Sequence, residues 1–133
     1  MNITKVFAAI ALWTATVATA KPTASSEVTT IYVGNTAVTP VAISVRGTVL
    51  SFPTKPSKVV LGSAGSFGVE YVENDVVVSP LSTGVRSNLF VYLMGRRFGF
   101  DLRAAAEGSA SLVIVRDSIE KTIEAKEAIH GGK

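Results

Sequence analysis

Few side chains in this sequence have the type and spacing that catalysis requires. The single histidine is His130, three residues before the end and beside two glycines. This is a poor position for a general base, which must be held within hydrogen-bond reach of its substrate. A Ser-His-Asp arrangement would need the same terminus to fold back onto the domain. The sequence has no cysteine, so thiol chemistry and cysteine-ligated metals are excluded.

Two carboxylates held close together can hydrolyse glycosides, so the acidic residues are candidates for this chemistry. Glu70, Glu73 and Asp75 lie in a predicted hairpin and at its tip, where solvation is their ordinary role. Asp101 is the one acid inside an apolar strand, and we expect it to face outward opposite Phe90 or to pair with a nearby arginine. No His pair and no acidic cluster has metal-ligand spacing. We predict a protein that is not an enzyme, with no catalytic residue, metal or cofactor.

Two further features resemble ligand sites only superficially. The loop from Gly62 to Ser66 is rich in glycine but lacks the Lys-Ser/Thr ending of a phosphate-binding loop, and no helical pattern follows it. Basic residues gather around a later hairpin, at Arg86, Arg96, Arg97 and Arg103. A nucleic-acid site normally combines a basic patch with interleaved aromatic residues. We predict a flexible connector and a solvated rim, and no nucleic-acid partner.

Residues 1–20 have the pattern of a signal peptide. Lys5 precedes an apolar run from Val6 to Val17, and Ala18-Thr19-Ala20 has the small-x-small form of a cleavage site. The run is shorter than the about 20 apolar residues that span a bilayer, so we expect no membrane span after cleavage. Removing 20 of the 133 residues leaves 113, with 12 basic and 10 acidic side chains. This length suits one domain with a modest core.

The mature chain is predicted to fold as a single all-β domain. Residues 21–27 are small and polar, which is typical of a flexible N-terminus. Short runs of Val, Ile, Thr and aromatic residues then alternate with Gly, Pro and Asn, which favours a single β-sandwich of short antiparallel strands over residues 28–116. Before the main hairpin, strands are expected at Val28 to Val33, Val41 to Val45 with Val41, Ile43 and Val45 buried, Val49 to Phe52, Lys58 to Leu61, and Phe67 to Val72 paired with Val76 to Pro80 around Asn74-Asp75; Leu112 to Val115 is the last strand.

One C-terminal α-helix is predicted within residues 117–133. Asp117 and Glu120 have the spacing of a capping box, and Gly131-Gly132 follows the helix as a stop signal. Its apolar seam, Ile119 and Ile123, is thin, so the helix needs a surface to lie on. The sequence leaves open whether that surface is the sandwich or a partner.

The segment from Ser79 to Leu102 is predicted to form one β-hairpin. With Gly95-Arg96 as a type II′ turn, Gly95 takes the positive φ angle. One buried face then contains three facing pairs, Leu93 with Phe98, Val91 with Phe100 and Leu89 with Leu102. A slip of one residue would place apolar side chains opposite Gly99 and Asp101, so burial favours the first register. The opposite face places Tyr92 over Gly99, and a strand apolar on both sides is expected inside a sandwich or beside a partner.

Residues 58–102 resemble the N-terminal domain of the TraK and ninth VirB protein (CagX-like) family of type IV secretion systems. Family-motif positions include Gly62, Pro80 and Asn88. The resemblance covers about a third of the chain and lies in five segments of matching order and spacing: Val59-Val60-Leu61-Gly62, Phe67-Gly68-Val69, Val76 to Leu81, Asn88 to Tyr92 and Phe98 to Leu102.

The resemblance implies a structural, non-catalytic subunit in the periplasm, on the outer-membrane side of a secretion or conjugation complex. Such subunits form multimeric rings with other subunits of the envelope complex. Full-size members also carry a C-terminal domain that contacts a small lipoprotein and the channel-forming partner, and one helix stands at that place here. The alternative function is a free-standing periplasmic binding module, such as an inhibitor or carrier.

Ring subunits must present two different surfaces to their neighbours. On the hairpin we therefore expect Phe90, Tyr92 and Met94 to contact a neighbouring subunit. The thin apolar seam of the helix adds Ile119 and Ile123 as interface candidates.

Overall fold

The computed structural model describes residue 11 and residues 14–18, 27–105 and 109–131. Most of the predicted signal peptide, nearly all of the predicted flexible N-terminus and the final two residues lie outside the described residues. Within the described part, the strands are β1 Val28–Val33, β2 Val38–Ile43, β3 Thr48–Ser51, β4 Lys58–Leu61, β5 Phe67–Val72, β6 Asp75–Pro80, β7 Arg86–Leu93, β8 Arg96–Ala104 and β9 Leu112–Asp117, followed by the helix α1 Ser118–His130.

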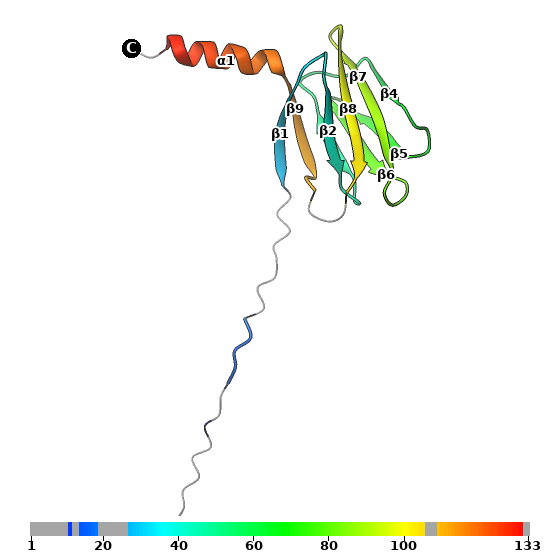
Figure 1. The fold of residues 1–133 in the computed structure, drawn as a ribbon, viewed down its shortest axis with the longest axis vertical. Coiled ribbons are helices and arrows are strands. Elements are labelled where there is room, and N and C mark those ends of the chain that lie inside the picture. The colour runs from blue at the N-terminus through cyan, green and yellow to red at the C-terminus, as the bar shows by residue number, and fades with distance from the viewer. Residues whose placement is uncertain (1–10, 12–13, 19–26, 106–108, 132–133) are drawn as a thin grey trace, which may run out of the picture.

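The strands form two mixed sheets (Figure 1). One sheet has five strands in the order β1-β9-β3-β6-β5, and the other has four in the order β2-β8-β7-β4. The prediction of a mostly-β chain with a single C-terminal helix is confirmed. The prediction of purely antiparallel strands is wrong, because β1 and β3 both pair with β9 in parallel and β2 pairs with β8 in parallel. Strands near the N-terminal end of the domain therefore pair with strands near its C-terminal end.

One apolar core cluster contains residues from both sheets. Strand residues alternate between buried and more exposed positions, as in β7, because successive side chains point to opposite faces. The rings of Phe52 and Phe100 meet edge to face, with centroids 6.1 Å apart, a favoured aromatic geometry. The core cluster consists of Val33, Val41, Ile43, Leu50, Phe52, Phe67, Val76, Val78, Leu89, Val91, Leu93, Phe98, Phe100, Leu102, Val113 and Val115.

Val45 does not continue the buried face of β2, as the sequence had suggested. Its side chain is 55% exposed, because the chain turns before it. The Ser44 carbonyl accepts a hydrogen bond from the Gly47 N–H at 2.8 Å, and the Ser44 N–H donates to Thr48 Oγ1 at 2.9 Å. Gly47 has a φ angle of +97°, which favours glycine. The strand therefore ends at Ile43.

The turn between β7 and β8 is Met94-Gly95, and not Gly95-Arg96. Leu93 pairs with Arg96, Val91 with Phe98 and Leu89 with Phe100, a shift of two residues from the expected register. Met94 and Gly95 have φ angles of 48° and 71°, and positive φ at both central residues is the requirement of a type I′ turn. A shift of two residues keeps every side chain on its face, so burial alone does not distinguish the two registers.

The hairpin between β5 and β6 also turns one residue earlier than expected. Val72 pairs with Asp75, so Glu73 and Asn74 form the tip in place of Asn74-Asp75. Glu73 has a φ angle of 52°. Asp75 consequently belongs to a strand, where it pairs with Ser51 of β3 on its other side.

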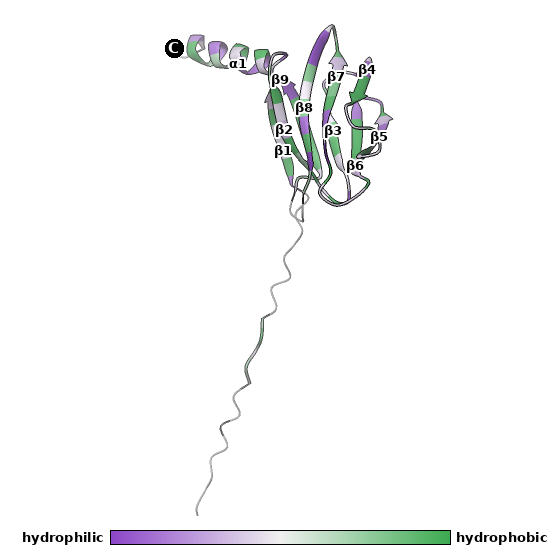
Figure 2. Ribbon diagram, turned by 45° about the vertical axis from the view of Figure 1, so that its right-hand side comes forward, coloured by the Kyte–Doolittle hydropathy of each residue, from purple (hydrophilic) through white to green (hydrophobic). Residues whose placement is uncertain are grey.

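Helix α1 projects away from the sheets (Figures 1 and 2). Asp117 caps it by accepting a hydrogen bond from the Ile119 N–H at 3.0 Å. None of its residues is buried. It contacts the domain at the surface, where Arg116 lies 3.7 Å from Glu124 and Lys121 lies over the ring of Tyr32. The helix therefore does not pack into the core of its own chain.

Of the helices in the described residues, none has the length and apolar character needed to cross a membrane.

Candidate interaction surface

The outer face of the four-stranded sheet carries an apolar row that crosses all four strands. We name it the apolar row, and it consists of Val38 of β2, Gly99 of β8, Phe90 of β7 and Val60 of β4, paired in that order. Val38 is 55% exposed and Val60 is 38% exposed. These side chains point away from the core, because Val41, Leu89 and Phe100 occupy the inward positions of the same strands. An exposed row of this kind is a candidate protein contact.

Gly99 lets the apolar row pack flat against the sheet. A Cβ added at Gly99 would lie 3.3 Å from Val38 Cγ2 and 3.4 Å from Phe90 Cε1, so neighbours on both sides lean over the glycine. Phe90 is half-buried as a result. Phe90 faces Gly99, and not Asp101 as the expected register had it. The close approach of both neighbours leaves little room for a larger side chain at this position.

Tyr92 and Met94 extend the exposed apolar surface toward the hairpin tip. Tyr92 is 38% exposed and lies between Lys58 and Arg97 on the neighbouring strands. Met94 is 78% exposed at the turn. The structure therefore brings two of the predicted interface residues, Phe90 and Tyr92, together on one face and places Met94 at its end.

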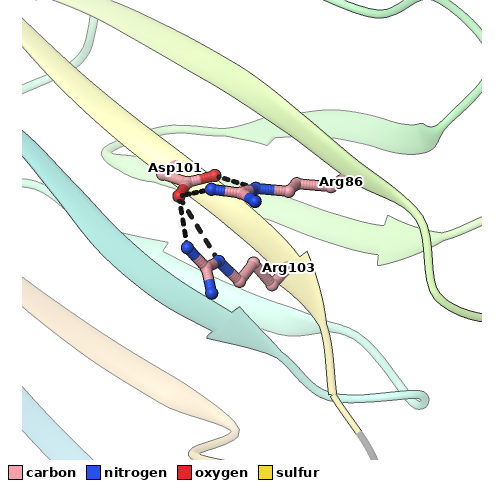
Figure 3. Close-up of polar contacts among 3 residues, drawn as sticks. All are labelled: Arg86, Asp101 and Arg103. Carbon is pink, nitrogen blue, oxygen red and sulfur yellow. Dashed lines mark hydrogen bonds and ion pairs between the residues drawn. The ribbon is translucent and has the colours of Figure 1, made fainter.

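Asp101 is held between two arginines on the same face (Figure 3). Arg86 binds it with two parallel hydrogen bonds, Nε to Oδ1 at 3.0 Å and Nη2 to Oδ2 at 2.7 Å. Arg103 donates to Oδ2 from Nη2 at 3.1 Å. The hydrogen bond from Arg86, helped by Arg103, lowers the pKa of Asp101 from 3.8 to about 2, although desolvation opposes the shift. Of the two roles expected for Asp101, pairing with arginine is the one observed.

Replacing Asp101 with asparagine should change the acid sensitivity of the protein. Because folding lowers this pKa from 3.8 to about 2, the carboxylate stabilises the fold above pH 3.8, and that contribution is lost as the pH falls toward 2. The Asp101→Asn variant should therefore have a lower urea midpoint than the wild type at neutral pH, and the difference should close near pH 2. Urea titrations across this range measure it. Equal midpoints at neutral pH would show that the two ion pairs contribute no net stability.

The helix residues Ile119 and Ile123 form a second exposed surface. Both side chains are exposed, and they lie on α1, apart from Phe90 and Tyr92. The beginning of the helix is tied to the hairpin, because Arg96 Nη2 donates to Asp117 Oδ1 at 3.1 Å and Arg96 Nε lies 2.6 Å from Oδ2. Asp117 therefore caps the helix and joins it to the hairpin with one carboxylate. The predicted interface residues occupy two surfaces and do not form one.

The remaining predicted residues belong to the core of the domain or to contacts between strands. The hairpin residues assigned to the core are all buried: Leu89, Val91, Leu93, Phe98, Phe100 and Leu102. Two family-motif positions meet, because the Gly62 N–H donates to the Asn88 carbonyl at 2.8 Å and a Cβ at Gly62 would lie 3.4 Å from the same oxygen. The third, Pro80, ends β6 opposite Phe67. Gly62 thus allows β4 to end close against β7.

Sequence reasoning missed Val38 and Val60 as parts of the surface. Val38 joins it only through the parallel pairing of β2 with β8, and Val60 through the pairing of β4 with β7. In β4, Lys58 and Val60 alternate with Val59 and Leu61, which pack against the core. The charge of Lys58 was a usable signal for the outer face of this strand. No comparable signal in the sequence predicts the position of Val38.

Comparison with known proteins leaves the family open. The sequence matches no protein-family model and no curated protein. In the part of the chain that the structure describes, no three His, Cys, Asp or Glu residues are grouped so as to hold a metal ion. The resemblance of residues 58–102 to the TraK family therefore stays a prediction.

Proposed function

We propose that this protein is a structural, non-catalytic subunit of a periplasmic envelope complex for type IV secretion or conjugation. The observation that carries the proposal is the apolar row, exposed across the outer face of the four-stranded sheet. Apolar side chains gathered on one exposed face are a common feature of protein contact sites. A subunit of a multimeric assembly uses them to contact its neighbours.

The proposed scaffold is a single β-sandwich with a helical extension. The shared core and the edge-to-face contact between Phe52 and Phe100 support face-to-face packing of the two sheets. The extension is α1, which leaves the domain with no buried residue. A rigid domain with an exposed face and a projecting helix has two distinct surfaces, which is what a ring subunit requires. Location on the outer-membrane side of the complex follows from the family resemblance and belongs to the same proposal.

A pull-down from solubilised envelopes tests this function. An affinity tag inserted at Gly65 suits the experiment, because this glycine lies in the loop between β4 and β5 and an added Cβ there meets no atom within 4 Å. In cells that carry the complete transfer system, we expect the tagged protein to fractionate with the envelope and to bring down other subunits of the complex. Deletion of the gene should abolish transfer.

A different result would favour the alternative function. A soluble, tagged protein that binds one small target, with unchanged transfer in the deletion strain, would identify a free-standing binding module and overturn the proposal. The matched control is an unrelated periplasmic protein with the same tag, which should bring down none of the transfer subunits.

A further inference from the structure

The outer face of the four-stranded sheet is strongly basic around the apolar row. Its charged side chains are four cations, Lys58, Arg86, Arg97 and Arg103, and one anion, Asp101. Asp101 binds Arg86 and Arg103. Among the described residues, Arg97 and Lys58 enter none of the ion pairs. They flank Tyr92 on both neighbouring strands, so an apolar surface with free positive charge beside it faces solvent.

Helix α1 has the complementary pattern. Glu120, Glu124 and Glu127 are spaced by four and then three residues, so they share one side of the helix. Glu124 lies 3.7 Å from Arg116 of its own chain, which leaves Glu120 and Glu127 as the two without an ion pair among the described residues. Ile119 and Ile123 are also four residues apart, each directly before a glutamate, and form an apolar strip beside this acidic one. Lys121, which lies over Tyr32, is on a different side. The helix therefore offers an apolar strip with an acidic flank on one side, and Lys126, three residues after Ile123, borders the strip on the other.

The helix does not reach the basic face of its own chain. It follows β9 and contacts β1 and β9, which belong to the five-stranded sheet. The ion pair between Arg96 and Asp117 fixes its beginning, and the remainder extends away from the domain (Figure 1). A partner for the helix must therefore come from another molecule.

We propose that α1 of one copy binds the outer face of the four-stranded sheet of a second copy. Ile119 and Ile123 lie on the apolar row, and the acidic side of the helix faces Arg97 and Lys58. The dimensions agree, because a helix of 13 residues is about 20 Å long and four strands spaced about 4.8 Å apart present a row about 14 Å wide. Opposite charges on the two surfaces set the orientation.

This contact is heterologous, because the two copies use different surfaces. Such contacts continue from copy to copy and produce a ring or an open filament. The inference rests on the proposed function, since it names the partner of the surface on which that function depends. It requires the purified chain to associate with itself.

Single-cysteine cross-linking tests the contact directly. The chain has no cysteine of its own, so Ile123→Cys, Val60→Cys and Val38→Cys each introduce one thiol. Full-length protein is purified in the form that cells accumulate, and the Ile123→Cys protein is mixed with either sheet variant and treated with a short bis-maleimide. We expect a mixed cross-link between the helix variant and at least one sheet variant. Val72→Cys, a matched control that is 56% exposed on the other sheet, should give little mixed product.

Several outcomes would overturn the inference. These are cross-links only between two Ile123→Cys chains, equal yields with Val72→Cys, or no mixed product with a monomeric mass by light scattering. Binding of α1 to a different envelope protein, with a monomeric purified chain, would also overturn it. That last result would leave the proposed function intact, whereas a pull-down without transfer subunits would reject the function even if the chain cross-links to itself.

Charge reversal tests the orientation. Glu127→Lys and Arg97→Glu should each weaken self-association by about twofold to fivefold, as expected for an exposed ion pair, and the mixture of the two variants should recover association through the swapped pair. Glu70→Lys, an exposed glutamate on β5 of the other sheet, is the matched control and should have no effect. Light scattering over a dilution series compares the wild type, the three single variants and the mixture. The absence of recovery in the mixture would show that these two residues do not face each other.

Discussion

Replacing Leu89 with glutamate is expected to prevent folding at neutral pH. Leu89 is fully buried in β7 opposite Phe100. A carboxylate placed there loses its hydration and gains no cation, because the arginines of this region lie on the other face of the sheet. A buried glutamate can have a pKa of about 8 to 9, so the variant folds at pH 7 only by taking up a proton. That uptake costs about 4 kcal/mol, because pH 7 is about 2.7 units above the normal glutamate pKa, and the lost apolar packing adds to it. Small domains have a total stability of about 5 to 15 kcal/mol.

Circular dichroism and urea denaturation at neutral pH measure this effect. Leu89→Ala is the matched control and should stay folded with a loss of about 2 to 5 kcal/mol, because it creates a cavity without a charge. Partial recovery of the Leu89→Glu variant in mild acid would support the charge as the cause, since protonation removes it. A folded Leu89→Glu protein with an unchanged urea midpoint would contradict the placement of this side chain in the core.

The main hairpin shows what period-two patterns predict and what they leave undetermined. The alternation of Leu89, Val91 and Leu93 with polar or aromatic neighbours was enough to assign the buried face. The same pattern repeats every two residues, so it is satisfied equally by registers that differ by two. The deciding factor is the turn, in which Met94 adopts a φ angle of 48°. A left-handed methionine is uncommon, so residue preferences pointed to the wrong turn.

The parallel pairs could not be predicted from local patterns. Val38 joins the surface because β2 lies along β8, and these strands are far apart in the sequence with no turn between them. Local turn signals identify antiparallel hairpins such as β7 and β8, and they led to an all-antiparallel expectation. The sequence therefore predicted one strand of the candidate surface, β7, and missed the row that crosses the sheet.

The helix illustrates the same limit at the chain end. The capping role of Asp117 follows from its position before an amphipathic segment. Its ion pair with Arg96 depends on the fold, because the hairpin tip must come close to the end of β9. The sequence left open whether the helix lies on its own domain, and in the structure none of its residues is buried.

Replacing both Phe90 and Tyr92 with glutamate is expected to leave the monomer folded and to abolish self-association. Tyr92 is 38% exposed between Lys58 and Arg97, so a carboxylate there gains two cross-strand cations. Phe90 is half-buried, and its loss uncovers Gly99 at a cost of about 1 to 2 kcal/mol. The same two carboxylates remove the centre of the apolar row and repel the acidic side of α1.

Light scattering and urea denaturation of the purified double variant separate the two effects. Association should fall by at least about tenfold, which corresponds to 1.4 kcal/mol, while the urea transition stays cooperative. The matched control is Val72→Glu together with Leu81→Glu, both at exposed apolar positions outside the four-stranded sheet, which should leave association unchanged. Loss of the cooperative transition in the Phe90 and Tyr92 variant would mean that this face is part of the folding core. A folded variant that associates as strongly as the wild type would exclude the apolar row as the contact surface, because the variant has lost the aromatic centre of the row and carries two carboxylates that repel the acidic side of α1.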